Sequence, residues 1–429
     1  MRQKGNRRQR RTFVVGDRQI NVASSLIPVV AALALTPILT RSLGSIGFGL
    51  WATLFAVLGS IQLVDFGVGS SLLRFMTVAQ DKEGRSGSKR YLASAWLYYA
   101  VLAVFSLIVV VPWHQSLYEF VAARTASPTL TIIIFFCLVV LMPISNASLF
   151  ALQSVGDFKH SAAIVLCSQL AYASIIILGS SFLNFTVATA LIAQMCQVTI
   201  VFVFVMVHLK MHSARQLLTK HEFRKFGEFS SRIWLTNLSS VAVLQLPVIV
   251  VAAMVSPAEV GVYGLAAMVA LGLRNLPLAS LAPVIRSLTG TVENIVIQSR
   301  AADKTWRKGL TLYTGVGIVG IVLGVPVLGG PGYAQAIGPC ILLFIGYVIQ
   351  LWGALTTIAA RQLELTKVEW RATALGAAIH LALLWFAISA LGLYGPGAVL
   401  VISQTVTLFF VRKQFRSFSS QSTPFTPAL

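Results

Sequence analysis

The chain has 429 residues, of which 56% are hydrophobic and only 11% are charged, and its mean hydropathy is +0.81. Soluble domains carry charge on about a quarter of their residues, so this composition excludes a soluble enzyme and predicts that the lipid bilayer is the solvent of the protein. The formal net charge of +20 would suit a protein that binds nucleic acid, but the placement of the charges argues against that class.

Continuous apolar runs recur along the whole chain. A helix needs about 20 mostly apolar residues to cross the hydrocarbon, whereas barrel strands would alternate apolar and polar residues. The expected fold is therefore an all-α polytopic membrane protein of about twelve transmembrane helices. The spans are predicted at residues 20–40, 47–73, 91–112, 129–152, 161–179, 185–208, 233–255, 260–285, 309–329, 335–360, 370–391 and 395–411. The four cysteines fall inside apolar runs without a CxxC pair, so we expect no disulfide, no metal and no cofactor.

The basic residues gather on one side of these spans. With the N-terminus in the cytoplasm, 30 of the 33 Lys and Arg residues lie in cytoplasmic segments, Arg41 and Arg124 lie in outer loops, and Arg274 lies within a span. Positive loops face the cytoplasm, so both termini are predicted to be cytoplasmic, and nucleic acid is not expected as a partner. The basic first 19 residues imitate a cleavable, twin-arginine type of signal, but the eleven further spans favour an uncleaved first helix whose arm contacts anionic membrane lipids.

The two halves of the sequence resemble each other. TRSLGSIGFGLWA after the first span is similar to VSPAEVGVYGLAA after the seventh, and Gly47 matches Gly261 at an offset of 214 residues. Gln194 in the sixth span pairs in the same way with Gln404 in the twelfth. Two like-oriented six-helix bundles around a central cavity are predicted, an arrangement known from transporters; helix pairs that merely share turn chemistry are the alternative. The predicted divisions are a basic cytoplasmic arm (1–19), an N-terminal bundle (20–208), a cytoplasmic linker (209–232), a C-terminal bundle (233–412) and a disordered cytoplasmic tail (413–429).

Four segments carry a family resemblance over roughly residues 15 to 413: LTRSLGSIGFGLW, LVDFGVGSSLLRF, SPAEVGVYGLAAMV and LGLYGPGAVLVISQTV. In order and spacing they resemble the polysaccharide transporters of the multidrug/oligosaccharidyl-lipid/polysaccharide exporter superfamily. The resemblance implies a flippase, working by alternating access, that moves a polyprenyl-pyrophosphate-linked oligosaccharide across a bacterial inner membrane. It also implies polysaccharide polymerase and glycosyltransferases as partners in the synthesis of O-antigen or exopolysaccharide.

Arg274 is the strongest candidate for a substrate-binding residue. It lies 14 residues into the eighth span, counted from Val260, which corresponds to about 21 Å of helix. An arginine at such a depth costs at least about 2.5 kcal/mol, so it is expected to face a wet interior. Its guanidinium suits phosphate oxygens, and a buried ion pair is the alternative.

Two further residues are candidates for ion coupling. Asp65 is an acidic residue within the predicted span 47–73, and Gln62 lies one helical turn away on the same face. Carboxylates at such depth carry protons in many transporters. A structural role for Asp65, such as a pair with Arg74, is equally compatible with the sequence. His380, ten residues into the eleventh span, titrates near neutrality in water, although a packing role is the commoner one.

Polar residues and prolines form similar stripes in the first and seventh spans. Asn21, Ser25 and Pro28 recur as Asn237, Ser240 and Pro247. These residues, with Gln62, are predicted to face a transport cavity, and Pro28, Pro247 and Pro277 are hinge candidates because proline interrupts helical hydrogen bonding. Helix–helix contacts by Ser and Asn are the competing interpretation.

Three other functions are weighed against a flippase. Polytopic glycosyltransferases and polymerases have long outer loops, whereas the longest outer segment here, 113–128, has about sixteen residues with Glu119 and His114. This segment is too small for a catalytic face, so a transporter rather than an enzyme is expected. The sequence also lacks a GxxxxGK[ST] nucleotide-binding loop, so transport driven by nucleotide hydrolysis is not expected. A cation-coupled multidrug efflux transporter would carry more acidic residues in its spans, and a membrane scaffold subunit without transport activity would have no continuous polar cavity.

Overall fold

The computed structural model describes residues 2–60, 67–83, 85–110, 114–154, 157–182, 184–209, 217–281, 292–363 and 365–422. The side chains of residues 2–26, and of scattered positions in other helices, lie outside this description. Every regular element in the described ranges is a helix, which confirms the predicted all-α class. The chain divides into two compact units, Met1–Asn237 and Leu238–Leu429, and each is considered by itself.

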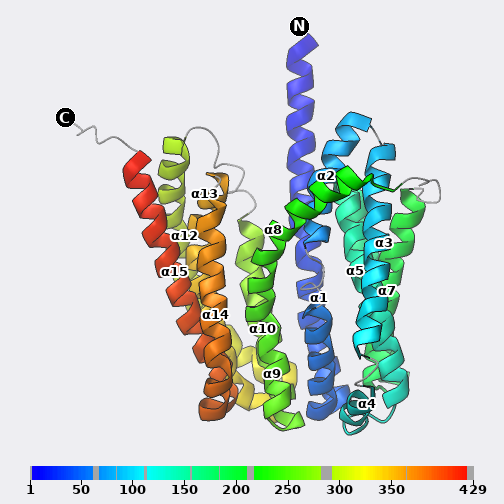
Figure 1. The fold of residues 1–429 in the computed structure, drawn as a ribbon. Coiled ribbons are helices and arrows are strands. Elements are labelled where there is room, and N and C mark those ends of the chain that lie inside the picture. Colours follow the sequence, from blue (N-terminus) through cyan, green and yellow to red (C-terminus); the bar gives the residue numbers. More distant parts are fainter. Residues whose placement is uncertain are drawn as a thin grey trace. The chain divides into compact units, whose positions relative to one another are not determined.

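The first unit begins with a helix that contains a sharp turn. Its helices are α1 (Arg2–Ser60), α2 (Val68–Glu83), α3 (Arg85–Val110), α4 (His114–Ala122), α5 (Pro128–Ser154), α6 (Phe158–Phe182), α7 (Val187–His208) and the first part of α8 (Lys220–Leu244) (Figure 1). Gly44 has φ of 64° and ψ of −179°, so α1 is two helices that correspond to the first predicted span and the start of the second. The second span was predicted to continue to residue 73. Residues 61–66 lie outside the description, but Gly67, with φ of 74°, directly precedes α2 and interrupts a regular helix there.

A cluster of buried side chains joins α2, α3, α5 and the start of α8. Leu72, Leu92, Tyr99, Ala151 and Phe226 are all less than 5% exposed, and they pack together as one apolar core. Apolar burial of this kind is worth about 25 cal/mol for each Å² removed from solvent, so this core holds the predicted linker helix against the unit.

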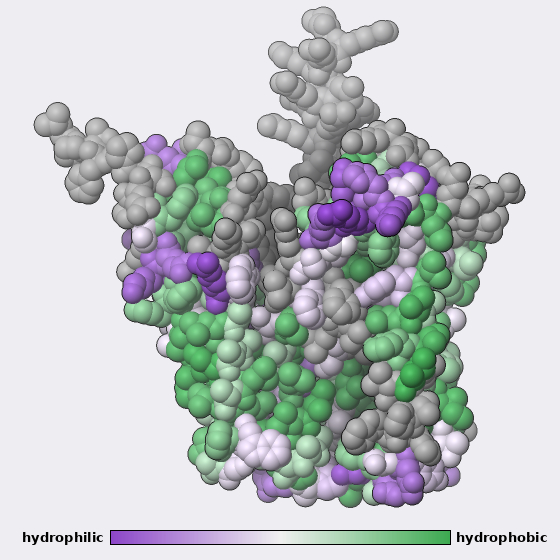
Figure 2. Space-filling view, in the orientation of Figure 1, coloured by the Kyte–Doolittle hydropathy of each residue, from purple (hydrophilic) through white to green (hydrophobic). Residues whose placement is uncertain are grey.

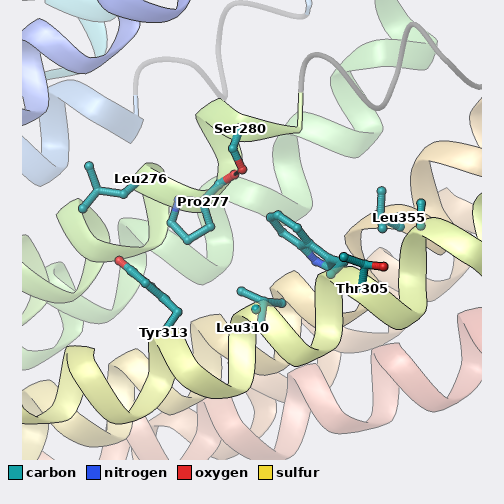
Figure 3. A pocket seen from close by; sticks show the side chains of 10 residues that line it. Leu276, Pro277, Ser280, Thr305, Leu310, Tyr313 and Leu355 are labelled. Carbon is teal, nitrogen blue, oxygen red and sulfur yellow. Dashed lines mark hydrogen bonds between the residues drawn. The ribbon is translucent and has the colours of Figure 1, made fainter.

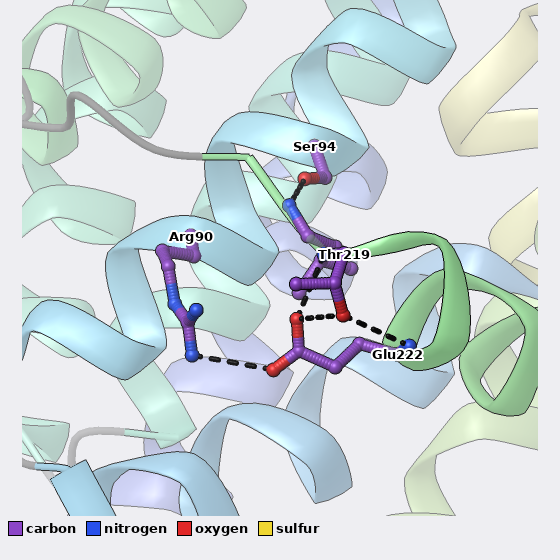
Figure 4. A network of polar contacts seen from close by, with 5 residues as sticks. Arg90, Ser94, Thr219 and Glu222 are labelled. Atoms are coloured by element: carbon purple, nitrogen blue, oxygen red, sulfur yellow. Dashed lines mark hydrogen bonds and ion pairs between the residues drawn. The ribbon is translucent and has the colours of Figure 1, made fainter.

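Polar contacts fix the start of α8 beside α3 (Figure 4). The backbone N–H and the hydroxyl of Thr219 both donate to Glu222 Oε2, at 2.8 Å each, and the backbone N–H of Glu222 donates to Thr219 Oγ1 at 3.3 Å. This reciprocal pair is a capping box. Arg90 Nη2 lies 3.3 Å from Glu222 Oε1, and the backbone N–H of Leu218 donates to Ser94 Oγ at 3.0 Å.

Replacing Glu222 by alanine is expected to lower the stability of the first unit by about 1 kcal/mol, the usual effect of losing a helix cap. Hydrogen bonds from the backbone and hydroxyl of Thr219 hold the pKa of Glu222 below its ordinary value, against the opposing effect of burial, and Arg90 adds to the shift. A lowered pKa in the folded state means that the contribution is complete above the unfolded carboxyl pKa of about 4.3 and is lost as the pH falls through the folded value.

Thermal unfolding of the purified protein between pH 7 and pH 3 measures this effect. The difference between wild type and Glu222→Ala should begin to shrink as the pH falls below about 4.3. It should be smallest once the pH is below the lowered folded-state pKa, because the carboxylate is then protonated in both states. Glu228, which pairs with Arg224 on the exposed face of α8, provides the control, since Glu228→Ala should change stability by less than about 0.5 kcal/mol. A pH-independent difference at Glu222 would contradict the assigned role of its charge.

The second unit contains the rest of α8 and the helices that follow it. These are α9 (Leu246–Met254), α10 (Pro257–Ser280), α12 (Val292–Gly329), η4 (Pro331–Ala336), α13 (Ile337–Gln362), α14 (Thr366–Leu391), η5 (Gly392–Tyr394) and α15 (Gly395–Ser422). Ser256 caps α10 with Glu259 in a second capping box. The chain reverses between α14 and α15 at Gly392, whose φ is 56°.

Within the described residues, eight helical stretches are long and apolar enough to cross a membrane. Two of them, Ile27–Ser60 and Glu369–Phe415, contain the turns at Gly44 and Gly392, so these eight stretches hold ten of the twelve predicted spans. The other two correspond to α3 and to the shorter apolar helix Val241–Met254. The protein is therefore a multi-pass membrane protein.

Large apolar side chains point outward from these helices. Leu312 and Leu323 of α12 and Phe386 of α14 are 73%, 67% and 73% exposed. Figure 2 shows mostly hydrophobic residues along the sides of the helices and hydrophilic residues gathered near their ends. Such surfaces would be unfavourable in water and are favourable against lipid.

The structure departs from the predictions near the C-terminal end of the described chain. Residues 413–422, predicted as disordered, continue the helix α15, and buried Phe415 packs against α12 and α13. The basic arm is helical from Arg2. The repeated positions have similar environments, because Gly47 and Gly261 are buried and Gln194 and Gln404 are only 7% and 6% exposed. The repeat itself and the predicted domain boundaries stay predictions.

Candidate functional site

Arg274 lies on α10 where this helix packs against α13. Its Nε donates a hydrogen bond to Gln350 Oε1 at 2.7 Å, and its Nη1 donates to Asn275 Oδ1 at 3.3 Å. The guanidinium carbon lies 5.6 Å from the ring centre of Tyr347, within the range of a cation–π interaction. The side chain is partly buried, so its position and direction are set by α13 rather than by solvent.

The contacts of Arg274 leave its positive charge without a negative partner in the described part of the chain. Its hydrogen-bond acceptors, Gln350 and Asn275, are neutral amides, and its Nη2 donates to no described residue. A guanidinium has five N–H donors, so several remain for a ligand. The ion pair considered as an alternative from the sequence is therefore not formed among these residues, and the arrangement suits an anion with several oxygens.

Neighbouring helices hold α10 in place around Arg274. The hydroxyl of Tyr313 on α12 donates to the carbonyl oxygen of Leu273 at 2.6 Å. On α10, Ala266 and Ala270 are fully buried, and their small side chains allow the close approach of α13. The residue before Arg274 is thus tied to α12, while the guanidinium is tied to α13.

An apolar cavity of about 600 Å³ lies on the neighbouring face of α10 (Figure 3). Its walls come from α10, α12 and α13, and they are Leu276, Pro277, Ser280, Ala302, Thr305, Trp306, Gly309, Leu310, Tyr313 and Leu355. Several of the polar groups are already bonded, since Trp306 Nε1 donates to Leu351 O at 2.9 Å and the Ser280 hydroxyl donates to Pro277 O at 2.7 Å. The cavity therefore suits a hydrocarbon group.

The structure does not place the other predicted substrate-binding residues beside Arg274. Gln62, and with it the coupling candidate Asp65, lies outside the described residues. Four others lie on described helices, but their side chains are outside the description: Asn21 and Ser25 on α1, and Asn237 and Ser240 on α8. Their roles stay predictions.

His380 is enclosed between α14 and α15. Its Nδ1 lies 3.3 Å from the hydroxyl oxygen of Ser403, and the two residues are 1% and 0% exposed. Its Nε2 is also buried and makes no hydrogen bond to a described residue. This environment supports a packing role, and an ion-coupling role for His380 stays a prediction.

The three hinge candidates have different surroundings. Pro28 lies inside α1 and Pro277 lies inside α10, where it also lines the apolar cavity. Pro247 stands in the first turn of α9, directly after the interruption at Gln245 that separates α8 from α9. The proline in the seventh span thus coincides with a break in its helix.

Residues 19–288 match the family described as polysaccharide biosynthesis protein. No curated protein matches the sequence.

The similar solved structures share the fold at low sequence identity. One is an inward-facing multidrug resistance MATE family transporter of the MOP superfamily, with a TM-score of 0.74, 14% identity, and coverage of 95% of this chain and all of that one. A second is an outward-facing structure of a multidrug resistance MATE family transporter of the MOP superfamily. Its TM-score is 0.60 and its sequence identity 14%, and the match covers 95% of this chain and 97% of that one. A third is a MOP superfamily transporter from Pyrococcus furiosus, described as having a binding pocket of reverse polarity. Its TM-score is 0.60 and its sequence identity 12%, and the match covers 95% of this chain and 96% of that one.

Proposed function

Because the chain belongs to the polysaccharide biosynthesis protein family and has the fold of MOP superfamily transporters, we propose that it is a lipid-linked oligosaccharide flippase. Its substrate is a polyprenyl-pyrophosphate-linked oligosaccharide, which it moves from the cytoplasmic to the outer leaflet of a bacterial inner membrane. The product feeds cell-surface or extracellular polysaccharide synthesis, where a polymerase and glycosyltransferases act as partners. Both termini are cytoplasmic in this proposal, in agreement with the distribution of Lys and Arg.

The observation that carries the proposal is the guanidinium of Arg274 held between neutral partners. A diphosphate cannot cross hydrocarbon alone, because removing a charge from water is costly unless another charge compensates it. Arg274 is oriented by Gln350 and Tyr347 and has no carboxylate partner among the described residues, so it offers a fixed positive charge and unused N–H donors to phosphate oxygens.

The cavity beside Arg274 supports a substrate that is part diphosphate and part hydrocarbon. We assign it to the isoprenoid segment next to the diphosphate, since its lining is mostly apolar and Leu273, which accepts a hydrogen bond from the cavity residue Tyr313, directly precedes Arg274. Charge recognition and hydrocarbon recognition are then carried by adjacent faces of α10.

Replacing Gly309 by phenylalanine should lower transport about tenfold, because the ring would occupy the space of roughly two methylene groups of the substrate, each worth about 0.8 kcal/mol. Gly309 lines the cavity and a Cβ there meets nothing within 4 Å, so the first atom of the new side chain is accommodated without a clash. Gly320 on the same helix is equally open but lies outside the cavity lining, so Gly320→Phe is the control. Equal transport rates of the two variants would remove the cavity from the substrate path.

A gradient is the proposed energy source, with Asp65 as the coupling residue and His380 as a second candidate. In vesicles, Asp65→Asn should abolish substrate-dependent proton or sodium flux while substrate binding remains, because an amide cannot take up and release a proton. Flux that persists at the wild-type rate in this variant excludes Asp65 from coupling.

A cation-coupled multidrug efflux transporter is the second candidate function, because structures described as multidrug transporters share the fold. A binding site for cationic drugs needs negative charge. The candidate site on α10 instead presents the positive charge of Arg274. A membrane scaffold in a polysaccharide assembly complex is a third candidate, and it requires no transport at all.

One reconstitution experiment separates the three. The purified chain is placed in vesicles with a fluorescent polyprenyl-pyrophosphate oligosaccharide, and the rate at which the label becomes accessible from the other side is measured. A flippase accelerates this rate and leaves the distribution of a cationic dye unchanged. Accelerated dye movement alone would support efflux, and no acceleration of either compound would support the scaffold.

A further inference from the structure

A second, polar pocket lies in the second unit, on the same part of α12 as the apolar cavity. It has a volume of about 230 Å³ and is formed by the first part of α12, the last part of α13 and the last part of α15. Its lining residues are Ser299, Arg300, Asp303, Arg307, Thr356, Arg412 and Phe415. Three arginines against one aspartate leave this lining with a formal charge of +2.

The charged groups are held in fixed positions by the protein. Arg307 Nη2 donates to Asp303 Oδ2 one helical turn away, and Arg412 Nη2 donates to the carbonyl oxygen of Trp352 at 3.1 Å. Asp303 is only 16% exposed, and its Oδ1 is buried without a hydrogen-bond partner among the described residues. Arg307 Nε is likewise buried without a hydrogen-bond partner among the described residues. A buried acceptor and a buried donor without partners are costly, so a ligand that satisfies both is favoured.

The position of the pocket along the chain places it at the level of lipid headgroups. Arg307 stands directly before the predicted span 309–329, and Arg412 directly follows the predicted span 395–411. Thr356 lies in the last turns of the span 335–360. One end of each of these three spans therefore lies at this pocket, on the side where the Lys and Arg residues gather. Basic pockets between helices at that depth suit anionic headgroups.

We propose that this pocket binds the headgroup of an anionic membrane phospholipid whose phosphate carries a hydroxyl-bearing alcohol, such as glycerol. The arginines bind the phosphate oxygens, and Asp303 Oδ1 accepts a hydrogen bond from the hydroxyl. The pocket is smaller than the roughly 300–1,000 Å³ of sites for drug-sized ligands, so it fits a headgroup and excludes an oligosaccharide. It shares no lining residue with the apolar cavity beside Arg274, although the two adjoin at Leu355 and Thr356 of α13.

Native mass spectrometry of the full chain in detergent tests the proposal with three added lipids of equal chain length. Phosphatidylglycerol supplies the phosphate and the hydroxyls, phosphatidylmethanol supplies the same charge without a hydroxyl, and phosphatidylcholine supplies no net charge. Wild-type protein is expected to retain phosphatidylglycerol about tenfold better than phosphatidylcholine and severalfold better than phosphatidylmethanol, since charge-assisted hydrogen bonds are the strong ones.

Variants on α12 give a matched comparison. Arg300→Gln with Arg307→Gln should reduce phosphatidylglycerol binding about tenfold, whereas Lys304→Gln with Lys308→Gln, which removes the same charge from outside the lining, should change it less than about twofold. Asp303→Ala should make phosphatidylglycerol and phosphatidylmethanol bind equally. Elution of each variant as a single species verifies folding, and Arg307→Gln alone replaces the double variant if the latter fails this check.

Three results would overturn the proposal. Equal losses in the two double variants would show that general positive charge attracts the lipid, and unchanged binding in Arg300→Gln with Arg307→Gln would exclude the pocket. Displacement of phosphatidylglycerol by a polyprenyl diphosphate at equal concentration would assign the pocket to the transported lipid. Because the readout is lipid binding, its failure leaves the flippase proposal untouched, and the reverse also holds.

Discussion

Arg274→Gln is expected to reduce transport of the lipid-linked oligosaccharide by about a hundredfold, because a charge-assisted hydrogen bond of roughly 3 kcal/mol is replaced by a weak neutral one. Glutamine can still contact Gln350, so the packing of α10 against α13 remains. The flipping rate in reconstituted vesicles measures the effect, and the amount of polymer on whole cells gives an independent measurement.

Two control variants define what is lost at this position. Arg274→Lys keeps the charge but loses the planar fork, so its rate should fall between those of wild type and Arg274→Gln. Arg371, at an exposed position of α14, is the matched arginine, and Arg371→Gln should transport normally. A normal rate in folded, membrane-inserted Arg274→Gln protein would exclude Arg274 as the substrate anchor.

The sequence pointed to Arg274 because a single charge inside an apolar run stands out without any knowledge of the fold. It did not point to Gln350 or Tyr347, which orient the guanidinium. Gln350 lies 76 residues from Arg274 in the sequence, and only the packing of α10 against α13 brings them together. An isolated glutamine in an apolar span was the available signal, and it is a weak one because glutamine is common at helix contacts.

The helices themselves were largely predictable, since hydrocarbon forces each apolar run to satisfy its own backbone. Turns were less predictable, because they depend on conformations of single residues. Gly67 interrupts the helix directly before α2, inside what was expected to be one continuous span, and its φ of 74° is a conformation that only glycine adopts easily. The tail was misjudged for a different reason: its composition is polar, but Phe415 is 7% exposed in a tertiary contact that anchors the last turns of α15.

The LGLYGPG segment, which contributed to the family resemblance, has a physical explanation that leads to the second large expected effect. Gly392 reverses the chain with a φ of 56°, and Gly395 then begins α15 against the last turn of α14. A Cβ at residue 395 would overlap the carbonyl group of Ala387 and approach the backbone nitrogen of Ile388. These are backbone atoms of a helix, so no rotation of a side chain can relieve the contact.

Gly395→Ala is therefore expected to destabilise the second unit by about 3 kcal/mol or more, at the upper end of the range for overpacked sites. Because native proteins are only marginally stable, this loss of stability should lower the unfolding temperature in detergent and the yield of folded protein. Gly397→Ala should act in the same direction, because its Cβ would lie 2.7 Å from Leu342 Cβ on α13. Gly332 in the same unit has open space within 4 Å, so Gly332→Ala should leave the unfolding temperature unchanged. Equal unfolding temperatures of Gly395→Ala and Gly332→Ala would contradict this prediction. The close approach of α14 and α15 at residue 395 would then not require glycine, and only the turn at Gly392 would.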